Sequence, residues 1–502
     1  MILMLYAFCA SVLSEVIVHV MVLRRGLRLL FIILACVLAN FASASLCVLR
    51  PNVLTGLIAA ISLYRTFNMV RIIKGRMHAN YLRRVTWRTS YMLIGTQVLL
   101  FAAWWLWYQM PRNRSFVWLM VAVAQALSAV ALFTSLRRRL HKTAPGHLNR
   151  HYSDAELPSL TVAIPARNET LDLQECLSSV IASDYPKLEV IVLDDCSQNN
   201  HTPEIIKSFA HDGVRFVQGE EPRPTWLAKN QAYDRLAKES SGEFIVFCGV
   251  DVRFEPDSLR QLVTLALTRK KSMVSVLPMQ QLPRRPHLSV IQAARYWWEL
   301  VPPRRLFNRP AVLSSCWIIE RKALVKTGGF AAVTRAIVPE AYFAKALIQG
   351  DRYSFIRSDK DLIVTSFKPR ADQIDTAVRM RYPQVHRRPE QVFLVTFANL
   401  ILLILPFIIA LAGWWLPVNA LAQTLAAASA VLLTVCYVRV TNATHIGRLP
   451  YSLIGMPVMI IVDVLLLHRS MWQYEFSVVE WKERNVCIPV MHTYPHPSNM
   501  HE

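Results

Sequence analysis

The stretch LEVIVLDDCSQNN, residues 188–200, decides the fold of the chain. Its apolar run ends abruptly in two adjacent carboxylates, Asp194 and Asp195. Short apolar runs bounded by polar or turn residues are typical of buried strands. We therefore expect a strand over 188–195. The two like charges at its end need hydrogen-bond donors or a cation to stay ionised together.

Three further stretches have the same pattern and predict strands over 160–166, 213–219 and 242–251. Between the first two strands, ETLDLQECLSSVIAS has apolar residues at helical spacing, and AKNQAYDRLAKES at 228–240 predicts a second helix. Alternating strands and helices favour a mostly parallel α/β sheet with right-handed crossovers. Ligands bind such sheets beyond the carboxyl ends of the strands.

The composition indicates that much of the chain meets lipid, because 53% of the 502 residues are hydrophobic and the mean hydropathy is +0.29. Runs of about 20 apolar residues are long enough to span a bilayer. Such runs predict transmembrane helices near 3–23, 28–49, 52–70, 90–109, 116–135, 392–412, 417–438 and 451–467. No small-residue cleavage site follows the first run, so we expect an anchor and not a removed signal.

Basic residues alternate between the loops of the N-terminal third, as the positive-inside rule requires. RRGLR, RIIKGRMHANYLRRVTWR and RRRLHK follow the first, third and fifth predicted spans, and the opposite loops carry fewer charges. Five spans place the N-terminus outside an inner (plasma) membrane and the chain after Leu140 in the cytoplasm. We expect Pro457 to break the last apolar segment, which also contains Asp463. An interfacial or re-entrant segment there would keep the tail cytoplasmic.

These patterns divide the chain into a transmembrane region at 1–140, a cytoplasmic α/β domain at 155–385, transmembrane or interfacial helices at 390–470, and a tail at 471–502. The net charge of +22 is compatible with nucleic acid, anionic lipid or a phosphorylated ligand. In a membrane protein, basic flanks of spanning helices explain such a charge, so we expect no nucleic-acid partner. The nine cysteines show no C-x-x-C pair, which favours free thiols.

Polar residues follow three of the predicted strands, at 165–169, at Asp194 and Asp195, and at Asp251. Carboxylates gathered at one edge of a sheet favour a hard, oxygen-ligated ion such as Mg²⁺ or Mn²⁺, which could bridge to a diphosphate. Lys229 precedes a helix and could approach the same phosphate. The alternative is that Asp194 and Asp195 only cap the following turn.

The motif order TVAIPARNE, EVIVLDDCS, WLAKNQA, FIVFCGVDVRFEPDSL, TGGF and PEAYFAKAL resembles a membrane-integrated glycosyltransferase of family 2 with the GT-A fold. The resemblance covers about 155–385 and implies a nucleotide-sugar donor, typically a UDP-sugar, and a divalent cation. It assigns the base and ribose to Asp194 and Asp195, with Pro165 and Glu169 lining the nucleotide. The metal-binding acid of the D-x-D motif falls on Asp251, and the first Asp of that motif is replaced by glycine.

The same resemblance places the catalytic base near the start of a helix that follows the G-G-F turn. Glu340 is the candidate, although Ala341 stands where the family has Asp. A carboxylate there could take a proton from an acceptor hydroxyl as the anomeric carbon is inverted. The helix dipole favours the ionised carboxylate and so opposes strong basicity. Glu340 could also be only a helix-start residue after Pro339, and Asp351 is a weaker alternative base.

The segment DQIDTAVRMRYPQVHRRPE, 372–390, partly resembles the Q-x-x-R-W signature of processive and lipid-directed relatives, with Tyr382 where Trp is usual. The matching polar residues are Gln373, Arg379 and Arg381. The arginines could neutralise a leaving diphosphate, or they could meet anionic lipid beside the membrane.

Two aromatic segments complete the analysis. ARYWWELVPPRR, 294–305, has Tyr296, Trp297 and Trp298 beside arginines, which suits an interfacial helix or an acceptor platform better than a core helix. EWKERNVCIPV, 480–490, resembles the W-x-G-R element of lipid-directed relatives, with Glu483 at the Gly position. The histidines at 492, 496 and 501 are spaced too irregularly for a metal site.

The resemblance favours an inverting glycosyltransferase that moves a sugar from a nucleotide donor to a membrane lipid or glycan at the cytoplasmic face. A processive polysaccharide synthase is the second hypothesis, which the degraded Q-x-x-R-W signature disfavours. The third is a non-catalytic, nucleotide-binding membrane subunit of an export system. The replaced Asp residues at 249 and 341 keep that hypothesis open.

Overall fold

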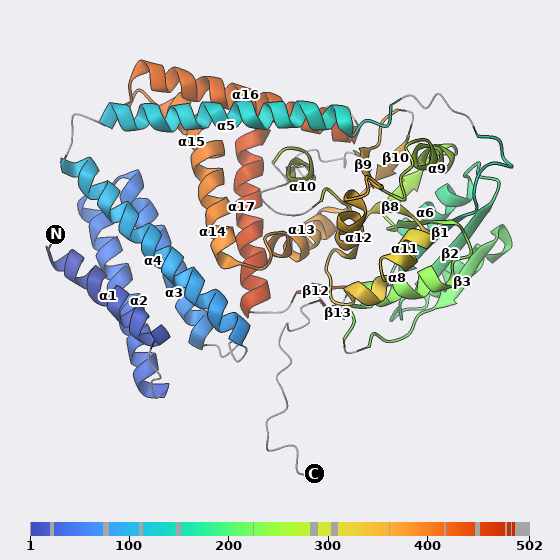
Figure 1. Ribbon diagram of the computed structural model, residues 1–502, viewed down its shortest axis with the longest axis horizontal. Helices are drawn as coiled ribbons and strands as arrows, with labels where there is room; N and C mark the ends of the chain where they lie inside the picture. Colours follow the sequence, from blue (N-terminus) through green and yellow to red (C-terminus); the bar gives the residue numbers. More distant parts are fainter. Residues whose placement is uncertain are drawn as a thin grey trace, which may run out of the picture.

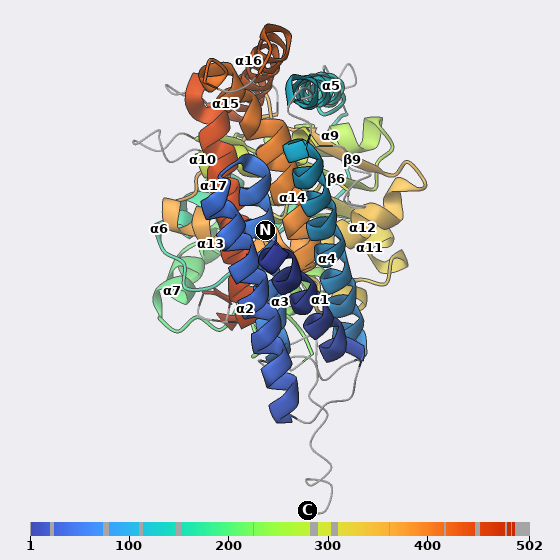
Figure 2. The ribbon, with the colours of Figure 1, turned by 90° about the vertical axis from the view of Figure 1, so that its left-hand side faces the viewer.

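A computed structural model of the protein describes residues 2–20, 25–73, 80–109, 114–146, 152–223, 225–281, 290–302, 310–360, 362–415, 418–446, 452–476, 479–482 and 484–486. An α/β domain lies to one side of a group of long helices, and the helices α14 and α17 lie between it and the N-terminal bundle (Figure 1). Figure 2 shows α1 to α4 side by side in front of α14.

The α/β domain is built on a seven-stranded sheet with the order β3-β2-β1-β4-β8-β6-β9. Its strands are β1 Leu160–Ala166, β2 Leu188–Asp194, β3 Val214–Gln218, β4 Phe244–Cys248, β6 Met273–Leu277, β8 Cys316–Glu320 and β9 Tyr353–Arg357. Strands β3, β2, β1 and β4 are parallel, and β8 runs antiparallel to both β4 and β6. The four strands that the sequence predicted are therefore confirmed to within a few residues, and so is their parallel pairing.

Both faces of this sheet are covered by helices. Successive side chains of a strand point to opposite faces, so each strand contributes side chains to both cores. On one face Val162 and Ile164 pack with helices α6 Leu171–Ile181 and α9 Ser258–Thr268. On the other face Ala163 packs with helices α8 Ala228–Glu239, α11 Arg321–Lys326 and α12 Pro339–Ile348. A sheet buried on both faces explains why its strands have continuous apolar sequences.

A second sheet, in the order β11-β7-β10-β5, connects the α/β domain to the long helices. Its strands are β5 Val252–Phe254, β7 Met279–Gln281, β10 Val364–Ser366 and β11 His445–Ile446. Strand β11 follows the C-terminal end of helix α16 and pairs with β7. A long apolar helix therefore contributes directly to the domain's secondary sheet, which the sequence analysis did not anticipate.

The helices of the N-terminal part are α1 Ile2–Val20, α2 Arg25–Leu49, α3 Val53–Ile73, α4 Asn80–Gln109 and α5 Arg114–Lys142. The C-terminal ones are α14 Pro389–Ala398, a π-helical turn at Asn399–Ile404, α15 Leu405–Ala412, α16 Ala420–Thr444 and α17 Ser452–Phe476. Helices α5 and α16 pack side by side across the ends of α15 and α17 (Figure 1).

Six helical segments among the described residues are long and apolar enough to cross a membrane: 26–49, 53–71, 115–142, 389–411, 420–444 and 454–476. They match six of the eight predicted spans. The other two predictions, 3–23 and 90–109, coincide with apolar helical stretches of fewer than 18 residues. These findings indicate a membrane protein.

The predicted break at Pro457 is wrong, because α17 is a continuous helix of 25 residues with this proline inside it. Pro457 lies in the second turn, where only the Leu453 carbonyl loses its usual backbone partner. Asp463 does not disrupt the helix either, since its carboxylate faces a cationic partner from the α/β domain.

That partner is Arg381 on α13 Arg370–Gln384, which forms an ion pair with Asp463. Trp298 on α10 Val290–Leu300 donates its Nε1–H to the same carboxylate at 2.8 Å, and its ring lies 4.6 Å from the Arg381 guanidinium carbon. All three side chains are buried or partly buried. This contact joins the long helices to the helix that carries Arg379.

The expectation that the aromatic run on α10 disfavours a core position is wrong. Tyr296 and Trp297 are buried in a cluster with residues of α5, α16 and α17. Three adjacent aromatics can all be covered because α10 contacts α13 on one side and the long helices on others. The run packs the α/β domain against the long helices.

Gly219 ends β3 beside the two acids of β2, and we expect Gly219→Ala to destabilise the domain. A Cβ there would lie 2.5 Å from the Asp194 carbonyl oxygen and 3.1 Å from the Asp195 Cα, both backbone atoms. Overpacking of this kind costs about 1–3 kcal/mol. Thermal unfolding of the detergent-solubilised protein should show a lower midpoint, whereas Gly350→Ala, with its nearest contact at 3.6 Å, should not. Equal midpoints for the two variants would contradict the close approach.

Asp463→Ala should destabilise the contact between α17 and α13 because it leaves the Arg381 guanidinium buried without its carboxylate. Breaking one partner of a buried pair costs about 3–5 kcal/mol. The matched double variant Arg381→Met with Asp463→Leu should recover most of the loss, since no charge remains to be satisfied. Denaturant or thermal unfolding of both variants measures this, and an Asp463→Ala variant as stable as the parent would contradict it.

Candidate active site

Asp251 lies beyond the carboxyl end of β4, in the turn that leads into β5. Strand β10 lies next to β5 and brings Ser366 close enough to donate its hydroxyl to Asp251 Oδ2 at 2.9 Å. Lys368, two residues further on, has its Nζ 3.9 Å from the same oxygen. The secondary sheet therefore presents a hydroxyl and an ammonium group to this carboxylate.

Asp251 lines a cavity of about 210 Å³ at the carboxyl ends of the parallel strands. Five cationic side chains from different elements or loops line the same cavity: Lys229, Arg295, Lys368, Arg379 and Lys482. Among its other lining residues are the predicted nucleotide residues Pro165 and Glu169, and the acids Asp172, Asp372 and Asp375. Such a mixture of charges in a partly enclosed space favours a ligand that carries both anionic oxygens and hydrogen-bond donors.

The titrating groups of this cavity influence one another. Burial alone would raise the pKa of Asp251, but Lys368, Ser366 and Arg295 together hold it below its ordinary value. Burial lowers the pKa of Lys368, and Arg295 lowers it further. Burial, with a contribution from Arg295, also lowers the pKa of Arg379, to about 10. An anion bound beside these cations would therefore stabilise their charged forms, and a diphosphate group is such an anion.

Asp194 does not line this cavity. Its carboxylate accepts hydrogen bonds from the backbone N–H of Ser197, at 3.3 Å, and from the Ser197 hydroxyl. The side chain is buried and stabilises the turn after β2. This geometry corresponds to the turn-capping alternative that the sequence left open for Asp194.

Asp195 and Glu169 face cations that come from the C-terminal end of the described chain. A short hairpin, β12 Glu480–Trp481 and β13 Arg484–Asn485, lies against the loops after β1 and β2. Arg484 Nη1 lies 2.7 Å from Asp195 Oδ1, and Lys482 forms an ion pair with Glu169. Burial raises the pKa of Asp195 despite its guanidinium partner.

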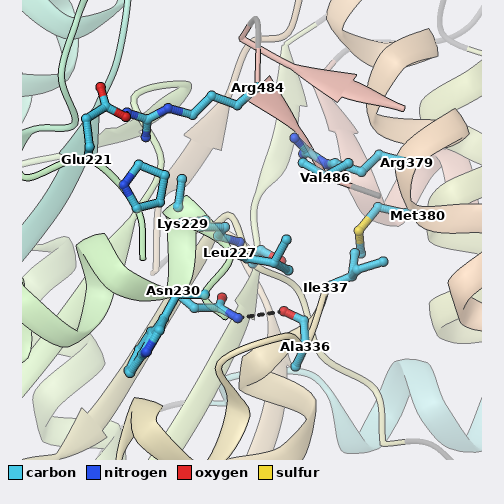
Figure 3. A pocket seen from close by; sticks show the side chains of 14 residues that line it. Glu221, Leu227, Lys229, Asn230, Ala336, Ile337, Arg379, Met380, Arg484 and Val486 are labelled. Atoms are coloured by element: carbon cyan, nitrogen blue, oxygen red, sulfur yellow. Dashed lines mark hydrogen bonds and ion pairs between the residues drawn. The ribbon is translucent and has the colours of Figure 1, made fainter. Parts of the chain in front are cut away.

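A second cavity, of about 360 Å³, adjoins the first and shares Lys229, Ser314, Arg379 and Met380 with it. Figure 3 shows Lys229, Leu227 and Asn230 on one side of it, Arg379 and Met380 opposite them, and Arg484 near Glu221. Asn230 holds the loop that forms its floor, because the amide donates to the carbonyls of Val333, Thr334 and Ala336. Its remaining walls include apolar side chains, Trp226, Leu227, Ile337 and Val486.

Glu340 lies beneath the boundary between the two cavities. It is in the first turn of α12, and its relative exposure is 0%. The Ser314 hydroxyl donates to its Oε1, and Lys229 Nζ lies 4.0 Å from the same oxygen. Within the described residues its Oε2 has no hydrogen-bond partner. Among the described residues, Ser314 and Lys229 therefore connect Glu340 to both cavities.

The three residues of the predicted Q-x-x-R-W-like segment separate in the structure. Arg379 lines both cavities. Gln373 is buried and donates its amide to the Lys368 carbonyl at 2.8 Å, which fixes the loop that carries Lys368. Arg381 points the other way, to Asp463. Of the predicted site residues, Pro165, Glu169, Lys229, Asp251 and Arg379 therefore come together in one cavity. The others lie around it.

One carboxylate of this cavity, that of Asp251, is available to hold a divalent metal ion. In the described part of the chain, no group of three or more His, Cys, Asp or Glu side chains is arranged to hold a metal ion. Asp251 supplies one carboxylate, with its second oxygen shared by Ser366 and Lys368. Mg²⁺ is commonly held by one or two carboxylates together with substrate phosphates, and this site fits an ion of that kind.

Sequence reasoning missed Arg295, Ser314, Lys368 and Arg484. Arg295 had a detectable signal, because it is a basic residue within the aromatic segment 294–305. Arg484 is the arginine of the W-x-G-R-like element at 480–490, but its contact with Asp195 could not be predicted, because it joins residues almost 300 positions apart. Glu483, Cys487 and the tail histidines lie outside the described residues.

Part of the α/β domain matches a known protein family. Residues 161–328 match the family described as Glycosyl transferase family 2. The matched segment begins in β1, contains β2, α8, β4 and Asp251, and ends at the glycine pair that precedes α12.

Two curated relatives match parts of the same region. Glycosyltransferase AglE of Haloferax volcanii is 34% identical over 99 residues, 19% of this chain and 31% of its own length. The 4,4'-diaponeurosporenoate glycosyltransferase of Staphylococcus aureus is 29% identical over 162 residues, 32% of this chain and 40% of its own length. The chain thus matches less than half of each relative.

A solved structure is also similar to this chain. The mannosyltransferase PcManGT from Pyrobaculum calidifontis, in complex with GDP-Man and Mn²⁺, is 17% identical and gives a TM-score of 0.41. The match covers 69% of this chain and 99% of that one. With the family match and the sheet order described above, the α/β part of this protein is a family 2 glycosyltransferase domain of the GT-A type, flanked by membrane-type helices.

Proposed function

We propose that the protein is an inverting glycosyltransferase that moves a sugar from a nucleotide-sugar donor, a UDP-sugar in the first instance, to a membrane lipid or glycan. The observation that carries this proposal is the cavity in which Asp251 faces Lys229, Lys368 and Arg379 at the carboxyl ends of the parallel strands. Cations arranged in this way would bind the diphosphate of a donor and stabilise the nucleoside diphosphate that leaves.

In this proposal Asp251 would hold Mg²⁺ or Mn²⁺ together with oxygens of the donor, and such an ion would supply additional positive charge beside the leaving diphosphate. Pro165 and Glu169 line the same cavity and would contact the nucleoside. Asp195 would contribute a hydrogen-bond acceptor for the base or the ribose. Asp194 would act indirectly, by fixing the turn that carries Asp195. Gln373 and Arg381 would position Lys368 and Arg379.

The acceptor hydroxyl attacks the anomeric carbon from the side opposite to the diphosphate, and the bond from that carbon to the phosphate oxygen breaks. The proton of the hydroxyl must then leave. Ser314 lines both cavities and donates to Glu340, so a proton can pass from the acceptor to Ser314 as Ser314 gives its own to Glu340. This route lets a buried Glu340 act as the general base.

The second cavity suits the acceptor, because it meets the donor cavity at Ser314 and has apolar walls beside its polar ones. The basic loops of the N-terminal part favour an inner-membrane protein with the α/β domain on the cytoplasmic side, where nucleotide sugars are available.

A second candidate function, nucleotide binding without transfer, is favoured by the full burial of Glu340 and the absence of Asp at position 341. A processive synthase remains the alternative within the enzyme class.

Asp251→Ala should abolish release of nucleotide from the donor. Purified protein with Mn²⁺ and a panel of UDP- and GDP-sugars is the assay. We expect at least about a hundredfold loss of turnover, because the carboxylate that would hold the metal beside Lys368 is gone. Chelation of Mn²⁺ should give a similar loss that added Mn²⁺ reverses. Asp212→Ala removes an exposed acid between helix α7, His201–Ser208, and β3, and should leave turnover unchanged.

The variant Glu340→Gln tests whether Glu340 acts in catalysis and not in nucleotide binding, because turnover and the Kd for UDP can be measured separately. If Glu340 is the base, turnover should fall by about 10²–10⁴, while the Kd for UDP changes less than about threefold. Ser314→Ala should lower turnover in the same direction, because it removes the group that links Glu340 to the cavities. A Glu340→Gln variant with full turnover would move the base elsewhere. A donor panel that gives no turnover with the parent protein, while UDP still binds, would favour the non-catalytic function.

A further inference from the structure

The cavity that the proposed function gives to the acceptor has mostly apolar walls. Its apolar side chains include Trp226, Leu227, Ile337, Met380 and Val486. They come from the connection between β3 and α8, from the loop before α12, from α13 and from the residue that follows β13. Figure 3 shows Leu227, Ile337, Met380 and Val486 around the same space. Walls of this kind favour a ligand with an apolar body and few polar groups.

Three polar side chains of this cavity already have partners within the protein. Arg484 Nη2 lies 3.4 Å from a Glu221 carboxylate oxygen. Lys229 Nζ lies 4.0 Å from Glu340 Oε1, and the Asn230 amide donates to three backbone carbonyls. A glycan acceptor would bring many hydroxyl groups into this space, and each one that is buried without a partner costs free energy. An alcohol on a hydrocarbon skeleton brings only one.

The apolar wall continues into the junction between the α/β domain and the membrane-type helices. Ile337 and Val486 pack against a buried cluster that combines Tyr382 of α13 with Val392 of α14 and Leu467 of α17. Tyr382 is fully buried in this cluster and lines neither cavity. The acceptor cavity therefore lies beside the apolar helices, where an acceptor anchored in lipid could reach it without exposing its hydrocarbon part to water.

We propose that the acceptor is a membrane-embedded alcohol with a hydrocarbon skeleton, and that it receives a single sugar. This inference rests on the proposed function, since it names the second substrate of the same site. The alcohol oxygen bonds to the anomeric carbon, and the nucleoside diphosphate leaves with the electron pair of the bond that breaks. The hydroxyl proton passes by way of Ser314 to Glu340. A second transfer would require the new, polar sugar to enter the apolar cavity, which opposes chain growth.

Acceptor use by the full chain in phosphatidylcholine nanodiscs tests this proposal. The probes are farnesol and geranylgeraniol on one side, and maltotetraose and cellotetraose on the other, each with the sugar nucleotide that gives nucleotide release. Mass spectrometry should find one sugar on each alcohol, formed at least about tenfold faster than any lengthened oligosaccharide.

Preferential lengthening of an oligosaccharide, or several sugars on one alcohol, would overturn the proposal. Nucleotide release without transfer to either alcohol would overturn it as well. If no sugar nucleotide is turned over and UDP does not bind, the proposed function itself fails, which is a distinct result.

A double variant, Ile337→Ala with Val486→Ala, tests the cavity wall. Its KM for geranylgeraniol should rise at least about tenfold, because lost methylene contacts weaken the binding of an apolar ligand by about that factor. The Kd for UDP should change less than about threefold. The control, Ile348→Ala with Val325→Ala, removes an Ile and a Val that are exposed on α12 and α11, and should behave like the parent.

An unchanged KM for geranylgeraniol in the first double variant would contradict the assignment of this cavity. Should that variant fold poorly, the single variant Ile337→Val removes one methylene group and should raise the same KM by a smaller factor. The preference of the parent chain for alcohols over oligosaccharides decides the proposal independently of either variant.

Discussion

The fold places a carboxylate opposite ammonium and guanidinium groups at the one edge of the sheet where parallel strands end. Asp251 leaves β4 at that edge, and the antiparallel pairing of β10 with β5 brings Ser366 and Lys368 to it. Helices α10 and α13 supply Arg295 and Arg379 to the same cavity. Cations that crowd together in a partly buried site are stabilised by an anionic ligand, and that constraint determines which ligands the cavity can bind.

The arrangement of the long helices is part of this constraint. Arg379 and Arg381 lie on one helix, and only the first reaches the cavity because the second is paired with Asp463 on α17. The ion pair fixes the rotation of α13 about its axis. Trp298 on α10 covers the pair and donates a hydrogen bond to Asp463. Strand β11, at the end of α16, fixes the secondary sheet in the same way. The membrane-type helices thus support the donor site directly, and the domain and the helices form one structural unit.

The sequence predicted the parallel strands and their order of appearance, because a sheet buried on both faces has continuous apolar strands that can be recognised locally. It also identified Lys229, Asp251 and Arg379, whose neighbours form motifs. It could not predict that Asp194 would cap its own turn while Asp195 met Arg484, since that distinction depends on a hairpin almost 300 residues away. The helical course of α17 through Pro457 was missed for a similar reason. Packing against α13 and α10 outweighs the local cost of a proline in an early turn.

The central claim is that a nucleoside diphosphate binds between Asp251 and the cations around it. A cryo-electron microscopy structure of the full chain with UDP and Mn²⁺ tests this most directly. The account predicts diphosphate density within hydrogen-bonding distance of Lys368 or Arg379, with the ion between that density and Asp251. UDP bound elsewhere on the protein, with this cavity unchanged, would contradict it.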